Sequence, residues 1–241
     1  MLMSLGRRLI VNADDFGRSS GINRGIIRSR ENGIVTSTSL MVRWPAAEAA
    51  AEYARRHPAL SVGLHVDLSE WSYVGDEWRR IYEVVPVDDA DAVAKEIAHQ
   101  LNLFRKLTGR EPSHLDSHQH VHRSEPVLSA LRGVAEQLAA PLRSIDSRVR
   151  YNGAFYGQSN IGDSHPIGIS VDGLIQSIRS LPPGVTELGC HPGDGDDIES
   201  MYRAERLVES QTLCDPRVGA AIEEESVILC SFLDYCDGVP G

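Results

Sequence analysis

The chain is poor in cysteine, in aromatic residues and in positive charge, and each shortage excludes a class of protein. The four cysteines in 241 residues show no C-x-x-C spacing of a metal site, and they are too few for a disulfide framework. Lys and Arg total 24 against 34 Asp and Glu, a net charge of −10, which argues against a nucleic-acid partner. We therefore expect a reducing, cytoplasmic setting and a small-molecule partner.

Long apolar runs are also missing. No stretch approaches the roughly 20 apolar residues that a membrane-spanning helix needs. The N-terminal segment, MLMSLGRRLIVNADDFG, turns acidic before an apolar run of secretory length, so it is interpreted as the first strand and not as a signal peptide. A Gly-x-Gly-x-x-Gly loop after that strand is absent as well, which disfavours an open, doubly wound sheet.

Short runs rich in Val, Ile and Leu alternate with helix-like segments along the chain. The apolar runs are 8–13, 37–42, 60–64, 112–115, 141–145, 185–190 and 226–230. The helical patterns cover 21–32, 45–57, 89–108, 125–139, 171–180 and 200–212. Strands and helices that alternate in this way form parallel βαβ units. With no Pro- or Ser-rich linker, we predict one α/β domain over residues 1–241, a TIM-barrel-like βα barrel that is complete, incomplete or distorted.

Metal-ligating and acid–base side chains follow four of the predicted strands. Asp14 and Asp15 come after the first run, His65 after the third, His118 after the fourth and His191 after the sixth. In a parallel barrel the carboxyl ends of all strands meet on one face, where active sites are built. We therefore expect these side chains to converge on one site.

The segment 113–122 carries His or Asp at every even position. An extended strand would place all of these side chains on one face, whereas a helix would align every second one of them. The strand is favoured, because a proline precedes the segment and apolar residues occupy two of the odd positions. A surface histidine tract is the alternative. The individual roles of several members stay open: His114, Asp116, His120 and His122.

One carboxylate and two imidazoles are a typical ligand set for a catalytic divalent cation that keeps a position open for water. A second, neighbouring carboxylate can then act as the base on that water. The adjacent pair Asp14 and Asp15 suits this division, because neighbours at a strand end point in different directions. The alternative, an N-cap pair for the next helix, is disfavoured because Ser19-Ser20 is better placed to cap it.

His191 follows Cys190, and the pair raises the question of a thiol nucleophile. Adjacent strand residues face opposite sides, so a hydrogen-bonded Cys–His dyad is disfavoured. His191 is instead interpreted as an acid near the metal, with a loop histidine that caps a turn as the alternative.

Six sequence blocks carry a family resemblance. They are LIVNADDFG at 9–17, GINRGI at 21–26, NGIVTSTSLMV at 32–42, VGLH at 62–65, HLDSHQHVH at 114–122 and CHPG at 190–193. In this order they resemble the YdjC-like carbohydrate deacetylase family, which includes chitooligosaccharide and hopanoid-pathway deacetylases. The resemblance implies a TIM-barrel-like fold and a hydrolase that removes an N-acetyl group from an amino sugar and releases acetate.

The resemblance also implies roles for individual residues. By motif position, Asp15, His65 and His118 would bind one divalent cation, Zn²⁺ or Mg²⁺, with Mn²⁺ or Co²⁺ as alternatives. Asp14 would be the general base and His191 the acid.

Several features remain undefined by the sequence. The stretch 66–86 is shorter than the lid that the family often carries, and its aromatic residues either stack on a sugar or pack among themselves. Those residues are Trp71, Tyr73 and Trp78. Asp116 is a candidate to orient a ligand histidine, and Arg143 to support Asp14 or to touch the substrate. A metal-dependent phosphoesterase, another amidohydrolase and an inactive sugar-binding protein are the alternative functions, and monomer and homo-oligomer both stay open.

Overall fold

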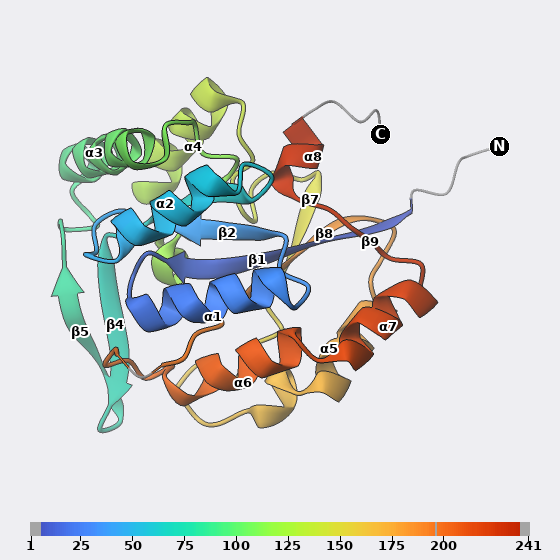
Figure 1. Cartoon of the computed structure of the whole chain (residues 1–241). Helices are drawn as coiled ribbons and strands as arrows, with labels where there is room; N and C mark the ends of the chain where they lie inside the picture. The colour runs from blue at the N-terminus through green and yellow to red at the C-terminus, as the bar shows by residue number, and fades with distance from the viewer. Residues whose placement is uncertain (1–5, 196, 237–241) are drawn as a thin grey trace.

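Parallel strands form a curled sheet at the centre of the computed structural model, which describes residues 6–195 and 197–236 (Figure 1). The strand order is β6-β3-β2-β1-β8-β7, and a short β9 also pairs with β1. These strands are β1 (Arg7–Phe16), β2 (Ser37–Leu40), β3 (Ser61–Val66), β6 (Leu115–Ser117), β7 (Val149–Asn152), β8 (Gly184–Cys190) and β9 (Ile228–Leu229). β1 is buried from Leu9 to Phe16, as expected of a parallel strand covered on both faces.

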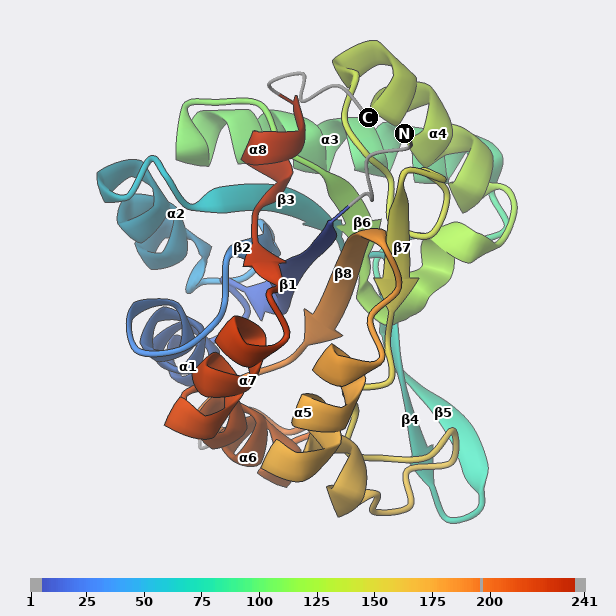
Figure 2. The same cartoon turned by 90° about the vertical axis from the view of Figure 1, so that its right-hand side faces the viewer.

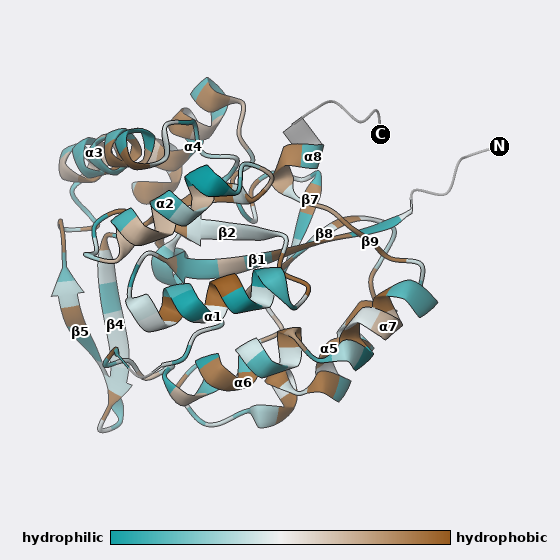
Figure 3. Ribbon diagram, viewed as in Figure 1, coloured by the Kyte–Doolittle hydropathy of each residue, from teal (hydrophilic) through white to brown (hydrophobic). Residues whose placement is uncertain are grey.

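Helices surround the sheet (Figure 2). They are α1 (Ser20–Glu31), α2 (Ala47–Arg56), α3 (Ala90–Thr108), α4 (Val127–Leu138), α5 (Val171–Arg179), α6 (Ala204–Leu213), α7 (Pro216–Glu224) and α8 (Phe232–Cys236), with 3-10 turns η1 (His118–Arg123) and η2 (Pro166–Ile169). The longer helices mix hydrophobic and hydrophilic residues (Figure 3), as expected of helices that bury one face. The predicted cap of the first helix is confirmed, because the Ser19 hydroxyl accepts a hydrogen bond from the Ile22 amide.

The barrel expected from the sequence is only partly formed: the sheet curls without closing into an eight-stranded ring. The strand predicted at 141–145 is reduced to one parallel bridge between Leu142 and Leu115. Ser144 has a φ of 63°, and the amides of Ile145 and Asp146 bond back to the Leu142 carbonyl at 3.0 and 2.9 Å. The chain therefore leaves the sheet in a tight turn, and β7 forms the opposite edge.

An antiparallel hairpin, β4 (Ser69–Val74) and β5 (Glu77–Glu83), projects beside the sheet (Figure 1). The sequence patterns did not predict this hairpin, nor β7, α7 and α8. None of the described helices has the length and apolar character needed to cross a membrane.

The described cysteines are free thiols at Cys190, Cys214 and Cys230. Cys190 is buried and donates to the carbonyl of Asn12 at 3.3 Å. The start of the N-terminal segment, residues 1–5, and the side chain of Cys236 lie outside the described part of the chain.

Candidate active site

Two adjacent aspartates near the carboxyl end of β1 line the same cavity. In a regular strand, neighbouring side chains point to opposite faces. Here the register of β1 against β2 shifts between Ala13 and Phe16, and Asp15 has a φ of 68°. Asp is among the residues that tolerate this left-handed conformation. The irregularity lets Asp14 and Asp15 line one cavity while each has its own partners.

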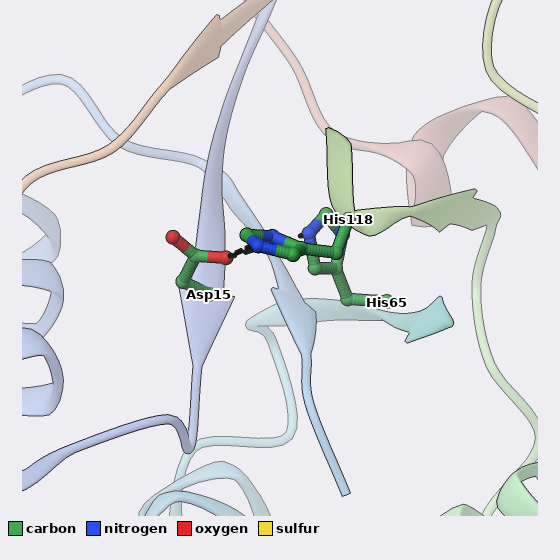
Figure 4. Close-up of side chains that lie close together, drawn as sticks. All are labelled: Asp15, His65 and His118. Carbon is green, nitrogen blue, oxygen red and sulfur yellow. Dashed lines mark ion pairs between the residues drawn. The ribbon is translucent and has the colours of Figure 1, made fainter. Parts of the chain in front are cut away.

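The Asp15 carboxylate points toward two imidazole rings (Figure 4). Its Oδ1 lies 3.5 Å from Nε2 of His65, near the end of β3, and 3.2 Å from Nδ1 of His118, directly after β6. The three donor atoms lie within 4.8 Å of one another, and all three residues are buried. The structure thus brings together the three residues expected to bind a cation.

This cluster fits a divalent cation. Among the described residues, Oδ1 of Asp15 and Nε2 of His118 are buried and have no hydrogen-bond partner, which is costly unless another group satisfies them. Although burial lowers the pKa of His65, the carboxylates of Asp116 and Asp14 raise it to about 10. The negative field that favours a proton here also favours a metal ion, because metals and protons compete for the same lone pairs.

Asp116 orients His65. Its Oδ1 lies 2.8 Å from Nδ1 of the ring, which leaves Nε2 to face Asp15. Its Oδ2 accepts from the Ser39 hydroxyl at 2.6 Å and pairs with Arg143 at 2.8 Å. A carboxylate on the far nitrogen of a metal-ligating histidine fixes the tautomer and the ring orientation. The placement agrees with the expectation that Asp116 orients a ligand histidine.

The strand predicted for the histidine-rich segment is wrong beyond Ser117. β6 ends there, and Gln119 and His120 follow with φ values of 49° and 55°. These left-handed residues turn the chain, so the even-numbered side chains do not share one face. His118 is the member that reaches Asp15.

The other three histidines of the segment have structural partners. Burial lowers the pKa of His114 and of His122 to about 4 and that of His120 to about 3, so all three are neutral at pH 7. The partners are the Phe232 ring for His114, the Tyr151 hydroxyl for His120, and the Ser117 hydroxyl with the Arg143 carbonyl for His122.

Arg143 supplies the counter-charge to the buried carboxylates. Its guanidinium donates to both oxygens of Asp14, at 2.6 and 2.7 Å, and lies 2.8 Å from Asp116 and 2.7 Å from Glu187. Asn12 donates to Asp14 at 2.9 Å. Burial raises the pKa of Asp14, but Arg143 holds it below the ordinary value. Asp14 therefore stays ionised, as a base must be before it accepts a proton.

His191 follows β8 and lies opposite Asp14. Its Nε2 is 3.8 Å from Oδ2 of Asp14, and its ring packs edge-on against Tyr156 and Tyr202. Its backbone N–H donates to Glu209, whose carboxylate lies 3.9 Å from Nδ1. Burial lowers the pKa of His191 to about 4. The ring is therefore neutral at rest and close to the carboxylate of Asp14.

Among the site residues that the sequence analysis missed are two ionisable residues of α6. Arg206 and Glu209 of α6 are buried, and they hold the Asp15 carboxylate and the His191 backbone respectively. They share the buried side of the helix with Leu213. The one signal that could have identified them is that they are ionisable residues at helix positions where the helical repeat predicts a buried side chain.

The site opens into a cavity of about 670 Å³, a volume typical of small-molecule pockets. Aromatic residues from several segments line it, namely Trp78, Tyr151, Phe155, Tyr156 and Tyr202. Trp78 belongs to the hairpin, which Gln119 holds through both the N–H and the carbonyl of Trp71, at 2.8 and 2.7 Å. Tyr73 packs edge-on against Trp78, and Trp71 lies beside Arg80.

Residues 8–224 match the family described as YdjC-like protein. The chain belongs to this family. It is 33% identical to a carbohydrate deacetylase of Geobacillus stearothermophilus, over 95% of this chain and 98% of that protein. It is 35% identical to a chitooligosaccharide deacetylase of Salmonella paratyphi B, over 95% and 99%.

A solved structure from Enterococcus faecalis V583 also shares the fold. That protein, proposed to be a cellobiose-phosphate cleavage protein, matches with a TM-score of 0.72 and 25% identity, over 95% of this chain and 99% of its own. The family resemblance predicted from the six sequence blocks is therefore confirmed.

Proposed function

We propose that this protein is a metal-dependent carbohydrate N-deacetylase, which hydrolyses the N-acetyl group of an amino sugar and releases acetate. One observation carries the proposal. A ligand set of Asp15, His65 and His118 converges in a buried site, with the ionised carboxylate of Asp14 beside it. Relatives that share about a third of the sequence are named carbohydrate deacetylase and chitooligosaccharide deacetylase, which supports an acetylated sugar as the substrate.

The ligand set would hold Zn²⁺ or Mg²⁺, with Mn²⁺ or Co²⁺ as alternatives, and such an ion supplies Lewis-acid activation of water and of the amide carbonyl. Asp14 accepts the proton of the water as its oxygen attacks the acetyl carbon. The C–N bond then breaks only if the departing nitrogen gains a proton, because an amine anion leaves poorly. His191 is neutral at rest, and its Nε2 lies 3.8 Å from Asp14. This separation is too long for direct transfer, so the proton taken from water would pass from Asp14 to His191 through one bridging water, and from His191 to the nitrogen.

The deciding measurement is acetate release from N-acetylated mono- and oligosaccharides by metal-loaded and by chelator-treated protein. We expect release from the loaded protein, a fall of at least about 100-fold after chelation, and recovery when the ion is returned. Loaded protein that releases no acetate but hydrolyses phosphate esters would be a phosphoesterase instead. Sugar binding without acetate release would identify an inactive sugar-binding protein.

A substitution at Trp78 tests whether an aromatic side chain of the cavity contacts the substrate. Its side chain lines the cavity and the residue is 48% exposed, whereas Trp71, 39% exposed, lies outside the lining. An aromatic ring offers a large apolar face to a ligand. We expect Trp78→Ala to raise the KM for an N-acetylated disaccharide about 3- to 10-fold with little change in kcat. The matched control, Trp71→Ala, should change neither constant, and equal effects of the two substitutions would contradict a substrate contact at Trp78.

A further inference from the structure

Arg206 forms an ion pair with the aspartate that is proposed to bind the metal. Its NH2 group donates to Oδ2 of Asp15, while Oδ1 of the same carboxylate faces His65 and His118. The two oxygens therefore have different surroundings, one toward the imidazoles and one toward the guanidinium. The two side chains are 2% and 1% exposed, so solvent weakens this charge-assisted hydrogen bond little.

Arg206 is fixed in place by further contacts. Its NH1 group donates to the carbonyl of His191 at 3.3 Å, and its guanidinium carbon lies 5.9 Å from the centre of the Tyr202 ring. Its own carbonyl accepts from the Gly193 amide at 3.1 Å. Among the residues that the structure describes, Asp15 is its only ion-pair partner. The guanidinium is thus held against Oδ2 by both its neighbours and its charge.

The second cation near Asp15 makes no hydrogen bond to Oδ2, because its nearer NH1 group has no hydrogen-bond partner among the described residues. Arg18 lies 3.9 Å from Oδ2 of Asp15 through its NH1 group, but its NH2 group pairs with Glu70 at 2.5 Å. Arg206 is therefore the cation that makes the direct hydrogen bond to Oδ2.

The number of oxygens that Asp15 offers would decide how open the metal site is. A carboxylate can bind a divalent cation through one oxygen or through both, and a catalytic cation needs a free position for water and substrate. We propose that Arg206 is a positioning residue that keeps Asp15 a one-oxygen ligand and so leaves that position free. The inference rests on the proposed metal site.

A positioning role and a merely structural role predict different results for Arg206→Met. If the side chain only supports the fold, metal affinity and turnover fall together. If it restrains Oδ2, its removal frees a second ligand oxygen and removes a competing positive charge, so metal affinity is kept or increased. Turnover then falls, because the second oxygen fills the position that water needs.

Cobalt(II) is the probe for this difference. We expect Arg206→Met to bind cobalt at least as tightly as the wild type in calorimetry, and to show weaker visible absorption because the bound ion gains a ligand. We expect its kcat for acetate release to fall about 10- to 100-fold, as for other residues that hold a metal ligand. The matched control is Arg203→Met, because Arg203 donates to the Gly195 carbonyl at 2.6 Å and lies outside the cavity lining. It should behave as the wild type.

Wild-type absorption in Arg206→Met at full cobalt occupancy would overturn the inference. A structure of the cobalt-loaded wild type gives a second test that needs no variant, because cobalt bound by both oxygens of Asp15 would also overturn it. A wild-type protein that binds neither cobalt nor zinc would instead overturn the proposed metal site, so the two failures are distinct.

Discussion

Asp14→Asn is expected to lower kcat for acetate release by about 10²- to 10⁴-fold, the usual contribution of a general base, and to leave cobalt binding in place. Asparagine has nearly the same shape as aspartate but does not accept a proton from water. The proposed ligand atoms lie on other residues. Arg143 keeps Asp116 and Glu187 as ion-pair partners, so the site should remain folded.

The matched control is the same substitution at an exposed position, Asp88→Asn, which should leave both kcat and cobalt affinity unchanged. Calorimetry with cobalt and an acetate assay on the same preparation separate the two properties. A wild-type rate in Asp14→Asn would show that another group accepts the proton. Loss of cobalt binding would place Asp14 among the ligands and not beside them.

The convergence of the site could be predicted because a parallel sheet places all strand carboxyl ends at one edge. A polar residue that directly follows an apolar run can therefore be placed at this edge even when the order of the strands in the sheet is unknown. His65 and the aspartates of β1 are such cases, and β3, β2 and β1 lie side by side in the sheet. Which of the two aspartates faces the imidazoles depends on the left-handed backbone at Asp15, which no spacing in the sequence indicates.

The counter-charges could not be predicted, because their burial depends on partners far away in the sequence. Arg143 lies in a run that resembles a strand, and it is buried because carboxylates from β1, β6 and β8 surround it. Arg206 belongs to an amphipathic helix and meets Asp15 only once α6 packs beside α1 (Figure 1). The number of βα units likewise did not determine whether the barrel closes. The chain leaves the sheet at the turn that contains Ser144, so the strand expected there does not form and this edge of the sheet stays open.

Arg143→Met is expected to lower the free energy of unfolding by about 3–5 kcal/mol, as when one partner of a buried ion pair is removed. The Arg143 side chain is 0% exposed and contacts Asp14, Asp116 and Glu187. Methionine fills much of the same volume but leaves these carboxylates without their counter-charge. Urea unfolding at pH 7, followed by tryptophan fluorescence, measures the change. The exposed Arg150 gives the control Arg150→Met, which should change the free energy by no more than about 0.5 kcal/mol.

The pH dependence separates the loss of charge from the loss of packing. In the wild type, burial raises the pKa of Asp14 and of Asp116, but Arg143 holds both below the ordinary 3.8. Their contribution to stability is therefore complete above that value and is lost as the pH falls through the lowered pKa values. In Arg143→Met, His65 still lowers the pKa of Asp14 and of Asp116, but the largest charge that opposes burial is gone. Both pKa values therefore rise, so these carboxylates take up protons at a higher pH than in the wild type and part of the penalty is relieved. The stability gap between wild type and variant should shrink toward about pH 4, whereas a constant gap would assign the destabilisation to lost packing around the arginine side chain.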